Sequence, residues 1–254
     1  MLKNLYVMHF SPTGGTKAGA LSLGKSLGEN IEEIDLSKPP KAKYTFTKDD
    51  TVLFALPVFA GRIPPFTAEK LKEYQGNGAT AIIMAVYGNR AYDDALLELK
   101  DSVEAQGFTV KAATAVIAEH SMVHTVAQGR PNEKDQQEMA EFAAKILVKL
   151  SKDQANAKVE VPGNSPYKPW QPLPVTPLVS ADCDECGRCA KNCPTQAIDK
   201  ENLKATNPDK CILCMRCVVQ CHTKARALPP QIQAMMEEKL GPLANVTQKN
   251  ELFL

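Results

Sequence analysis

The sequence predicts an α/β fold, a doubly wound parallel five-stranded sheet, followed by a small, separate α+β domain that is rich in cysteine. Three observations lead to this prediction. Residues 1–150 alternate short apolar runs with amphipathic helical segments, which is the pattern of strand–helix–strand units. Six prolines then fall between Ser151 and Ser180, and all eight cysteines lie between Cys183 and Cys221.

The five expected strands are short runs of apolar residues without a polar alternation. Such runs are typical of parallel strands buried on both faces. They cover residues 5–8, 31–36, 51–56, 81–86 and 114–117, of which 31–36 is the least apolar.

Two expected helices are recognised by their spacing and end signals. Leu96, Leu99 and Val103 lie on one helical face, and Gly107 is placed to end that helix. Asn132 can cap the last helix of the sheet domain. The expected buried face of that helix is Met139, Phe142, Ala143, Ile146 and Leu150.

The remainder of the chain divides at changes in composition. The proline-rich segment 151–180 is expected to be an extended, semi-rigid spacer. We expect Trp170, the only tryptophan, to fix this spacer onto one of the domains. The cysteine domain covers 181–226. The tail, 227–254, contains one helix whose apolar stripe, Ile232, Met235, Met236 and Leu240, is expected to pack in a core.

Composition and charge exclude several classes of protein. The 30 basic and 29 acidic residues give a net charge of +1, so no basic field indicates nucleic-acid binding. No apolar run reaches the roughly 18 residues that a membrane helix requires. The first ten residues show no small-residue cleavage pattern, so we expect no signal peptide. Cysteines confined to one short segment indicate metal binding in the reducing cytoplasm, rather than a disulfide framework.

The cysteines form two tandem copies of one pattern. Each copy places three cysteines at steps of three and a fourth cysteine four residues later. This spacing is typical of 4Fe–4S clusters, in which the fourth cysteine ligates the cluster of the other repeat. The alternative is structural zinc, which normally uses paired C-x-x-C knuckles and would leave a cysteine surplus. The crossed assignment gives one cluster to Cys183, Cys186, Cys189 and Cys221, and the other to Cys211, Cys214, Cys217 and Cys193.

Residues 181–226 therefore resemble a bacterial-type ferredoxin with two 4Fe–4S clusters. The cysteine spacing and Pro194 after the fourth cysteine carry this resemblance. His222 follows Cys221, where the family usually has proline. We expect this change to alter the tuning of the cluster and to leave its ligation by cysteine intact.

A glycine-rich loop follows the first expected strand and opens a helix. Its residues are Ser11, Pro12, Thr13, Gly14, Gly15 and Thr16. Small hydroxylated residues and glycines at a helix N-terminus present backbone N–H groups to a phosphate. The loop is neither a Walker nor a Rossmann motif. It is similar to the phosphate loop of flavodoxins, which binds the phosphate of FMN without a basic residue.

Two further loops should reach the same edge of a flavodoxin-like sheet, where the ligand binds. They contain Pro57, Val58, Phe59, Ala60, Gly61 and Arg62, and then Tyr87, Gly88, Asn89, Arg90, Tyr92 and Asp93. We expect Phe59, Tyr87 or Tyr92 to stack near the flavin, although simple loop packing is the alternative for each. We also expect Arg62 to lie over the flavin edge, with solvent exposure or pairing to aspartate as its alternative. A loop at residues 119–122 is a further candidate.

Along nearly its entire length the chain resembles flavodoxin–ferredoxin fusion proteins. The resemblance implies electron transfer between two 4Fe–4S clusters and FMN, with redox proteins as partners. No residues remain for an NAD(P)-binding domain. Two alternatives are a flavin-dependent reductase of a small molecule and a docking adaptor that binds no FMN.

Overall fold

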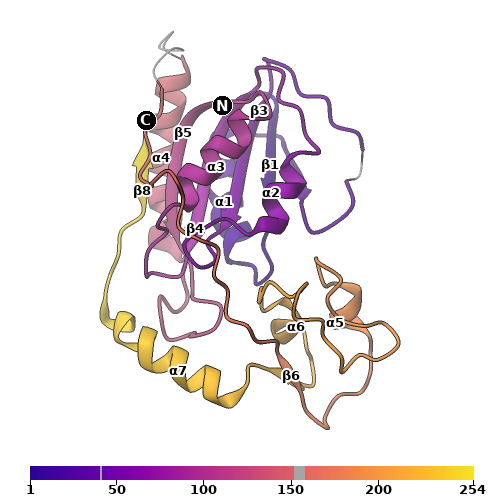
Figure 1. Ribbon diagram of the computed structural model, residues 1–254. Coiled ribbons are helices and arrows are strands. Elements are labelled where there is room, and N and C mark those ends of the chain that lie inside the picture. The colour runs from indigo at the N-terminus through magenta and orange to yellow at the C-terminus, as the bar shows by residue number, and fades with distance from the viewer. Residues whose placement is uncertain (41, 152–157) are drawn as a thin grey trace.

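Five parallel strands form the centre of the computed structural model, which describes residues 1–40, 42–151 and 158–254. These strands are β1 (Leu5–His9), β2 (Ile31–Asp35), β3 (Thr51–Pro57), β4 (Thr80–Tyr87) and β5 (Thr109–Ile117). They lie in the order β2-β1-β3-β4-β5, and each neighbouring pair is parallel (Figure 1). This is the strand order of flavodoxin-like folds, so the predicted fold class is confirmed.

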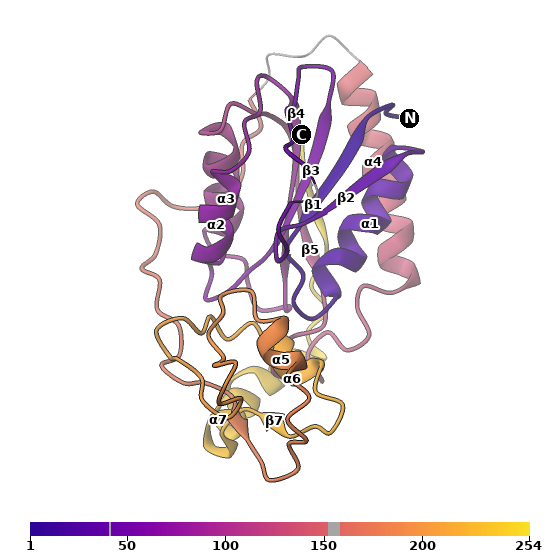
Figure 2. The same ribbon diagram turned by 90° about the vertical axis from the view of Figure 1, so that its right-hand side faces the viewer.

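Helices cover both faces of the sheet (Figure 2). α1 (Gly15–Leu27) packs beside α4 (Glu133–Ser151) on one face, and α2 (Pro65–Leu71) packs beside α3 (Ala95–Glu104) on the other. All of β3 is buried, because a parallel strand between two helical layers has no face toward solvent. Asn132 accepts a hydrogen bond from the backbone N–H of Lys134 at 3.0 Å, which confirms it as the cap of α4.

A sixth strand that the sequence did not predict completes the sheet. β8 (Glu251–Phe253) pairs antiparallel with β5, with Leu252 opposite Thr114. The preceding Asn250 is buried, and its side-chain oxygen accepts the N–H of Ile117 at 2.8 Å. Three residues are too few to show a periodic pattern, so this strand depends on tertiary contacts that its own sequence does not reveal.

The segment before the cysteine-rich region lies along α3. Asp94 accepts the backbone N–H groups of Asn164 and Lys168 at 2.8 and 2.7 Å, and Tyr167 donates its hydroxyl to Asp101. Residues 158–177 contain no helix or strand, as expected from the prolines. The part of the predicted spacer at 152–157 lies outside the described residues.

The cysteine-rich region is built from very short elements at one end of the sheet (Figure 1). They are β6 (Leu178–Val179) paired with β7 (Arg226–Ala227), and α5 (Arg188–Lys191) packed against α6 (Arg216–Val219). From there α7 (Pro230–Leu240) and the 3-10 helix η1 (Gly241–Asn245) return toward β8. Among the described residues, no helix is both long and apolar enough to cross a bilayer.

Candidate functional site

A cavity of about 520 Å³ lies where β1, β3, β4 and β5 end. It brings together the three loops in which the sequence predicts flavin contacts. The predicted residues that line it are Pro12, Thr13, Gly15, Thr16, Pro57, Val58, Phe59, Ala60, Gly61, Tyr87, Gly88 and Arg90. Six other predicted residues, all within the described part of the chain, lie outside its wall: Ser11, Gly14, Arg62, Asn89, Tyr92 and Asp93.

The loop after β1 turns directly into a helix at the cavity. Gly14 has a φ of 103°, a conformation that favours glycine, and α1 begins at the next residue. Ser11 accepts the backbone N–H of Lys17 at 2.9 Å, which holds the loop against the first turn of the helix. The first N–H groups of a helix have no partner within the helix. This end of the cavity therefore offers amide and hydroxyl donors suited to a phosphate.

The loop after β3 is a tight turn that presents Phe59 to the cavity. Phe59 and Arg62 exchange backbone hydrogen bonds at 2.9 and 3.0 Å across Ala60 and Gly61. Both central residues have positive φ, 49° and 81°. A side chain on Gly61 would collide with Asp93, so the turn requires glycine at that position.

Arg62 is placed differently from our expectation. Its guanidinium forms two hydrogen bonds of 2.7 Å with the carboxylate of Glu98, on α3. It also donates to the carbonyl of Lys168 and lies 4.6 Å from the ring centre of Tyr167. Glu98 is 8% exposed, and a buried carboxylate requires a close cation. Arg62 thus joins the sheet domain to the spacer and does not contribute to the cavity wall.

The loop after β4 has two roles. Tyr87 is buried at the cavity, and burial raises the pKa of its hydroxyl to about 12. Tyr92 packs edge-on against Tyr87 with ring centres 5.3 Å apart, and donates its hydroxyl to Glu251 of β8 at 2.8 Å. Asn89 donates to the carbonyls of Leu243 and Val246 at 3.1 and 2.7 Å. Tyr92 and Asn89 therefore hold the C-terminal segment against the cavity loops, whereas Tyr87 lines the cavity.

His120 lies in the cavity wall, in the loop that follows β5. Its Nδ1 accepts the backbone N–H groups of Met122 and Val123 at 3.2 and 3.1 Å, which places the ring proton on Nε2. Burial lowers the pKa of His120 to about 4, with smaller contributions from His124 and Arg90. A side chain on Gly88 would collide with this imidazole. His120 is therefore a neutral hydrogen-bond donor at neutral pH.

Other parts of the chain close the cavity on the side away from the sheet. Trp170, which is half-buried, lines it together with the neighbouring spacer residues, as expected for a residue that fixes the spacer. Met235 and Met236 of α7 also line it, although Met235 is 40% exposed and not in a core as predicted. Leu240 does pack in a core, with Val123 and Val126. The contribution of α7 could not be recognised locally, because its residues lie far along the chain from the loops they cover.

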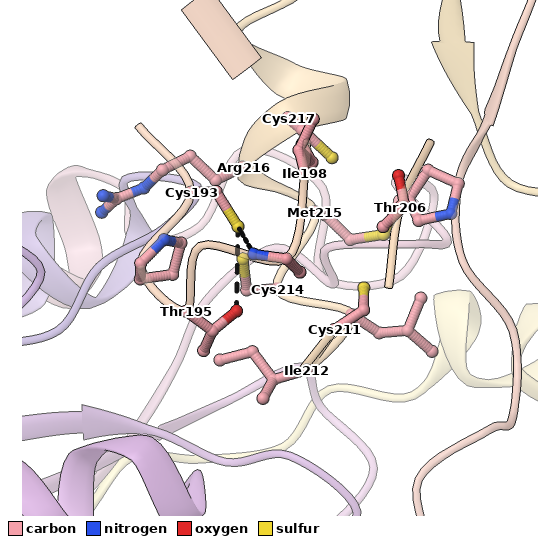
Figure 3. A pocket seen from close by; sticks show the side chains of 14 residues that line it. Cys193, Thr195, Ile198, Thr206, Cys211, Ile212, Cys214, Met215, Arg216 and Cys217 are labelled. Atoms are coloured by element: carbon pink, nitrogen blue, oxygen red, sulfur yellow. Dashed lines mark hydrogen bonds between the residues drawn. The ribbon is translucent and has the colours of Figure 1, made fainter. Parts of the chain in front are cut away.

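The third contribution to this cavity comes from the cysteine-rich region. Ile212, Leu213 and Cys214 line it, opposite the loops of the sheet. Cys214 also lines a second, smaller cavity (Figure 3). One cysteine therefore belongs to both cavities.

The smaller cavity gathers one crossed set of four cysteines. Cys193, Cys211, Cys214 and Cys217 line it together, although Cys193 belongs to the first repeat (Figure 3). The Sγ atom of Cys193 accepts the backbone N–H of Ala197 at 3.2 Å. Four convergent sulfurs with a backbone donor fit a thiolate-ligated cluster, whose potential depends on such hydrogen bonds.

Burial dominates the acidity of these thiols when no cluster is bound. It raises the pKa of Cys214 to about 12 and that of Cys217 to about 11. Arg216 opposes the increase at Cys214, and Arg226 opposes it at Cys217. Ligands of a cluster must lose their protons, so nearby positive charge favours assembly at this buried site.

The other set of cysteines differs by one exposed member, since all four cysteines of the first set are half-buried. Cys186 is exposed, whereas Cys183, Cys189 and Cys221 are half-buried. His222 lies beside this set, with Nε2 2.9 Å from a carboxylate oxygen of Asp184 and Nδ1 4.0 Å from the sulfur of Cys186. The two repeats match in one detail: Thr195 lies 3.7 Å from the sulfur of Cys193, and Thr223 lies 3.5 Å from that of Cys221.

Comparison with known proteins identifies the cysteine-rich region. Residues 178–222 match a family model described as a 4Fe-4S dicluster domain. The chain joins this dicluster segment to a flavodoxin-like sheet. A curated relative, a polyferredoxin-like protein of Methanocaldococcus jannaschii, is 41% identical over 61 residues. That alignment covers 24% of this chain and 27% of the relative, so the match spans about a quarter of that protein.

Solved structures resemble the sheet domain at low identity. A flavodoxin from the domain Archaea is 18% identical, with a TM-score of 0.42, over 58% of this chain and 98% of that protein. A short-chain flavodoxin associated with a bacterial microcompartment is 17% identical, with a TM-score of 0.40, over 59% of this chain and all of that protein. The flavodoxin-like fold itself follows from the strand order described above.

The dicluster segment and the flavodoxin-like sheet together support an electron carrier role for this chain. Iron–sulfur clusters move single electrons, and the protein sets their distance and potential.

Proposed function

We propose that the chain binds FMN in the larger cavity and two 4Fe–4S clusters at its eight cysteines, and that it transfers electrons between them. In this proposal residues 1–150 form the flavin domain, 151–180 the spacer, 181–226 the cluster domain and 227–254 a covering tail. Redox proteins are its partners, in the cytoplasm, where thiols stay reduced.

One observation carries this proposal: Cys214 lines both cavities. The phosphate-type loop lies in the wall of the larger cavity, and three further cysteines lie in the wall of the smaller one. A flavin seated on that loop would therefore share a wall with a cluster ligand. Such closeness is what a protein contributes to electron transfer between two cofactors.

The shape of the larger cavity supports FMN as its occupant. Donors for a phosphate lie at the start of α1, and aromatic side chains, Phe59 and Tyr87, lie in the neighbouring loops. His120 offers a neutral N–H donor in the same wall. Pockets that bind cofactors combine apolar walls with a few fixed polar groups of this kind.

Cofactor analysis of anaerobically purified protein tests the proposal. We expect about eight iron and eight sulfide ions per chain, as two cubane clusters require. We also expect one FMN, identified by chromatography after acid release. Protein that holds both clusters but no flavin, even after incubation with FMN, would support the docking adaptor and contradict the proposal.

Variants of the loop hydroxyls locate the flavin. Thr13→Ala combined with Thr16→Ala should weaken FMN binding, since each lost charge-assisted hydrogen bond is worth about 1.5–3 kcal/mol. The matched control is Thr109→Ala, which removes an exposed hydroxyl at the opposite end of β5. Equal FMN dissociation constants for the double variant and the control would show that the phosphate lies elsewhere.

A flavin-dependent reductase is the second candidate, favoured by the covered chamber. Trp170, Met235 and Met236 form a wall that faces the loops of the sheet, and a small molecule could bind between them and a flavin. Oxidation of the chemically reduced protein by small acceptors under anaerobic conditions distinguishes this candidate, because a carrier should show no saturable turnover.

A further inference from the structure

The two repeats place an arginine at the same position, immediately before the third cysteine. Arg188 precedes Cys189 in the first repeat, and Arg216 precedes Cys217 in the second. Their surroundings differ. Arg188 is exposed and reaches only the carbonyl of Gln220, at 3.5 Å. Arg216 is 8% exposed, although arginine is rarely buried without a charged partner.

Arg216 extends from the cysteine cavity toward the sheet domain. It lines the smaller cavity, and its guanidinium points away from the cysteine sulfurs (Figure 3). One of its nitrogens donates to the carbonyl of Ser11 at 3.2 Å, and the guanidinium lies 5.9 Å from the ring centre of Phe10. Ser11 begins the phosphate-type loop. Arg216 therefore joins the cysteine set of the smaller cavity to that loop.

The charge of Arg216 is not balanced by an ion pair. Among the described residues, no carboxylate forms an ion pair with Arg216 within 4.0 Å, and its buried Nε has no hydrogen-bond partner. The nearest carboxylate effect is at Asp35, the last residue of β2, where the charge of Arg216 helps to lower the pKa from beyond ion-pair distance. Arg226 is a second such case near the same cysteines. It is 3% exposed, and within the described ranges it donates to neutral oxygens, the carbonyl of Leu203 and the hydroxyl of Thr206. Two buried cations without a carboxylate in direct contact would be costly unless further negative charge lies nearby.

A 4Fe–4S cluster with four thiolates is such an anion, and one added electron makes it more negative. FMN would place a second anion, its phosphate, on the loop that Arg216 contacts. Flavodoxin-type loops bind this phosphate with hydroxyl and amide groups, so a cation from outside the loop would add to the binding. Both anions fit a buried guanidinium that has no carboxylate in direct contact.

We propose that Arg216 is a positioning and charge-compensating residue that couples the cluster of Cys193, Cys211, Cys214 and Cys217 to the flavin phosphate site. Its charge stabilises the reduced cluster, which gains one electron from a partner and no proton, and it strengthens FMN retention. This inference rests on the proposed function. It predicts that cluster potential and flavin affinity depend on one side chain of the cluster domain.

The test uses the full-length protein with both cofactors, in three variants. Arg216→Gln removes the charge, Arg216→Lys keeps it with a different shape, and Arg188→Gln is the matched control. Redox titration followed by paramagnetic resonance reports each cluster separately, and fluorescence reports FMN dissociation.

For Arg216→Gln we expect the ratio of reduced to oxidised buried cluster, at a fixed potential, to fall roughly tenfold, which is about 59 mV for one electron. The dissociation constant for FMN should rise several-fold in the same variant. Arg216→Lys should restore most of the cluster potential, and Arg188→Gln should leave both readings near those of the unmodified protein.

Two outcomes would overturn the inference. An unchanged cluster potential in Arg216→Gln would show that the charge does not act on the cluster. Equal losses in Arg216→Gln and Arg216→Lys would show that only the shape of the side chain matters. Failure of the proposed function is distinguishable, because unmodified protein would then contain clusters and bind no FMN.

Discussion

The two cysteine repeats have the same spacing, but the two crossed ligand sets that they form lie in different environments. The set containing Cys193 and Cys214 is enclosed between the cluster domain and the sheet, with buried Arg216 and Arg226 beside it. In the other set Cys186 is exposed and its three partners are half-buried, and Asp184 lies near this set. Identical ligand patterns can thus serve an outer and an inner electron site, because burial and neighbouring charge differ.

This difference suggests a direction for electron transfer. The exposed set is accessible to a partner protein, whereas the enclosed set shares a wall with the cavity proposed for FMN. We expect electrons to enter or leave through the outer set and to reach the flavin through the inner one.

The largest effect should follow loss of a crossed ligand. Cys193→Ala removes a ligand from the inner set, although Cys193 belongs to the first repeat, and about half of the iron should be lost. The remaining paramagnetic signal should be that of the outer cluster. Cys221→Ala is the matched variant and should remove the outer signal instead. The opposite pattern would show that ligands do not cross between repeats.

A smaller, kinetic difference should appear when iron is removed. An iron chelator reaches exposed Cys186 more readily than enclosed Cys214, so iron release should proceed in two phases. The outer cluster should be lost several-fold faster, as absorbance and paramagnetic resonance would show. A single phase that affects both clusters equally would remove the distinction between inner and outer sites.

Removal of FMN should affect the two clusters unequally. The inner set shares Cys214 with the cavity proposed for FMN, so flavin-depleted protein should show an altered inner-cluster signal. The outer signal should stay the same, and adding FMN should restore the original spectrum. Equal changes at both clusters would mean that the flavin does not lie next to the inner set.

The smallest effect concerns acid stability, to which His120 in the wall of the larger cavity should contribute. The pKa of His120 is lowered to about 4 by burial, from an ordinary value near 6.5. Between these values the unfolded chain binds more protons, so the free energy of unfolding falls as pH falls from about 6.5 to about 4. His120→Asn should reduce this pH dependence in urea unfolding, and an unchanged pH dependence would show that His120 does not cause it.

The regular parts of this molecule could be predicted from sequence because their signals are local. Apolar runs such as β3 and β4 are buried along nearly their whole length, and Asn132 caps α4 as its residue type suggests. The spacing of the cysteines is equally local, and a family model for dicluster domains matches it. Local signals therefore sufficed for the fold class and for the kind of cluster.

The rest depends on contacts between distant residues. Arg62 pairs with Glu98, 36 positions away, so its sequence position beside Gly61 did not reveal its role. Arg216 contacts Ser11, 205 positions away, and looks like Arg188 in sequence alone. β8 and α7 reach the cavity loops only through tertiary packing. Such placements follow from the folded chain as a whole.

Our central claim is that electrons reach the flavin through the inner cluster. The rate of flavin reduction through the clusters tests this claim most directly. Dithionite is mixed anaerobically with FMN-loaded protein, and flavin bleaching is followed by stopped-flow absorbance in the unmodified protein and in Cys193→Ala. With FMN bound equally in both, bleaching should be at least about tenfold slower in Cys193→Ala, because the inner cluster is missing. An equal rate in the two proteins would show that electrons reach the flavin without the inner cluster, and would contradict the claim.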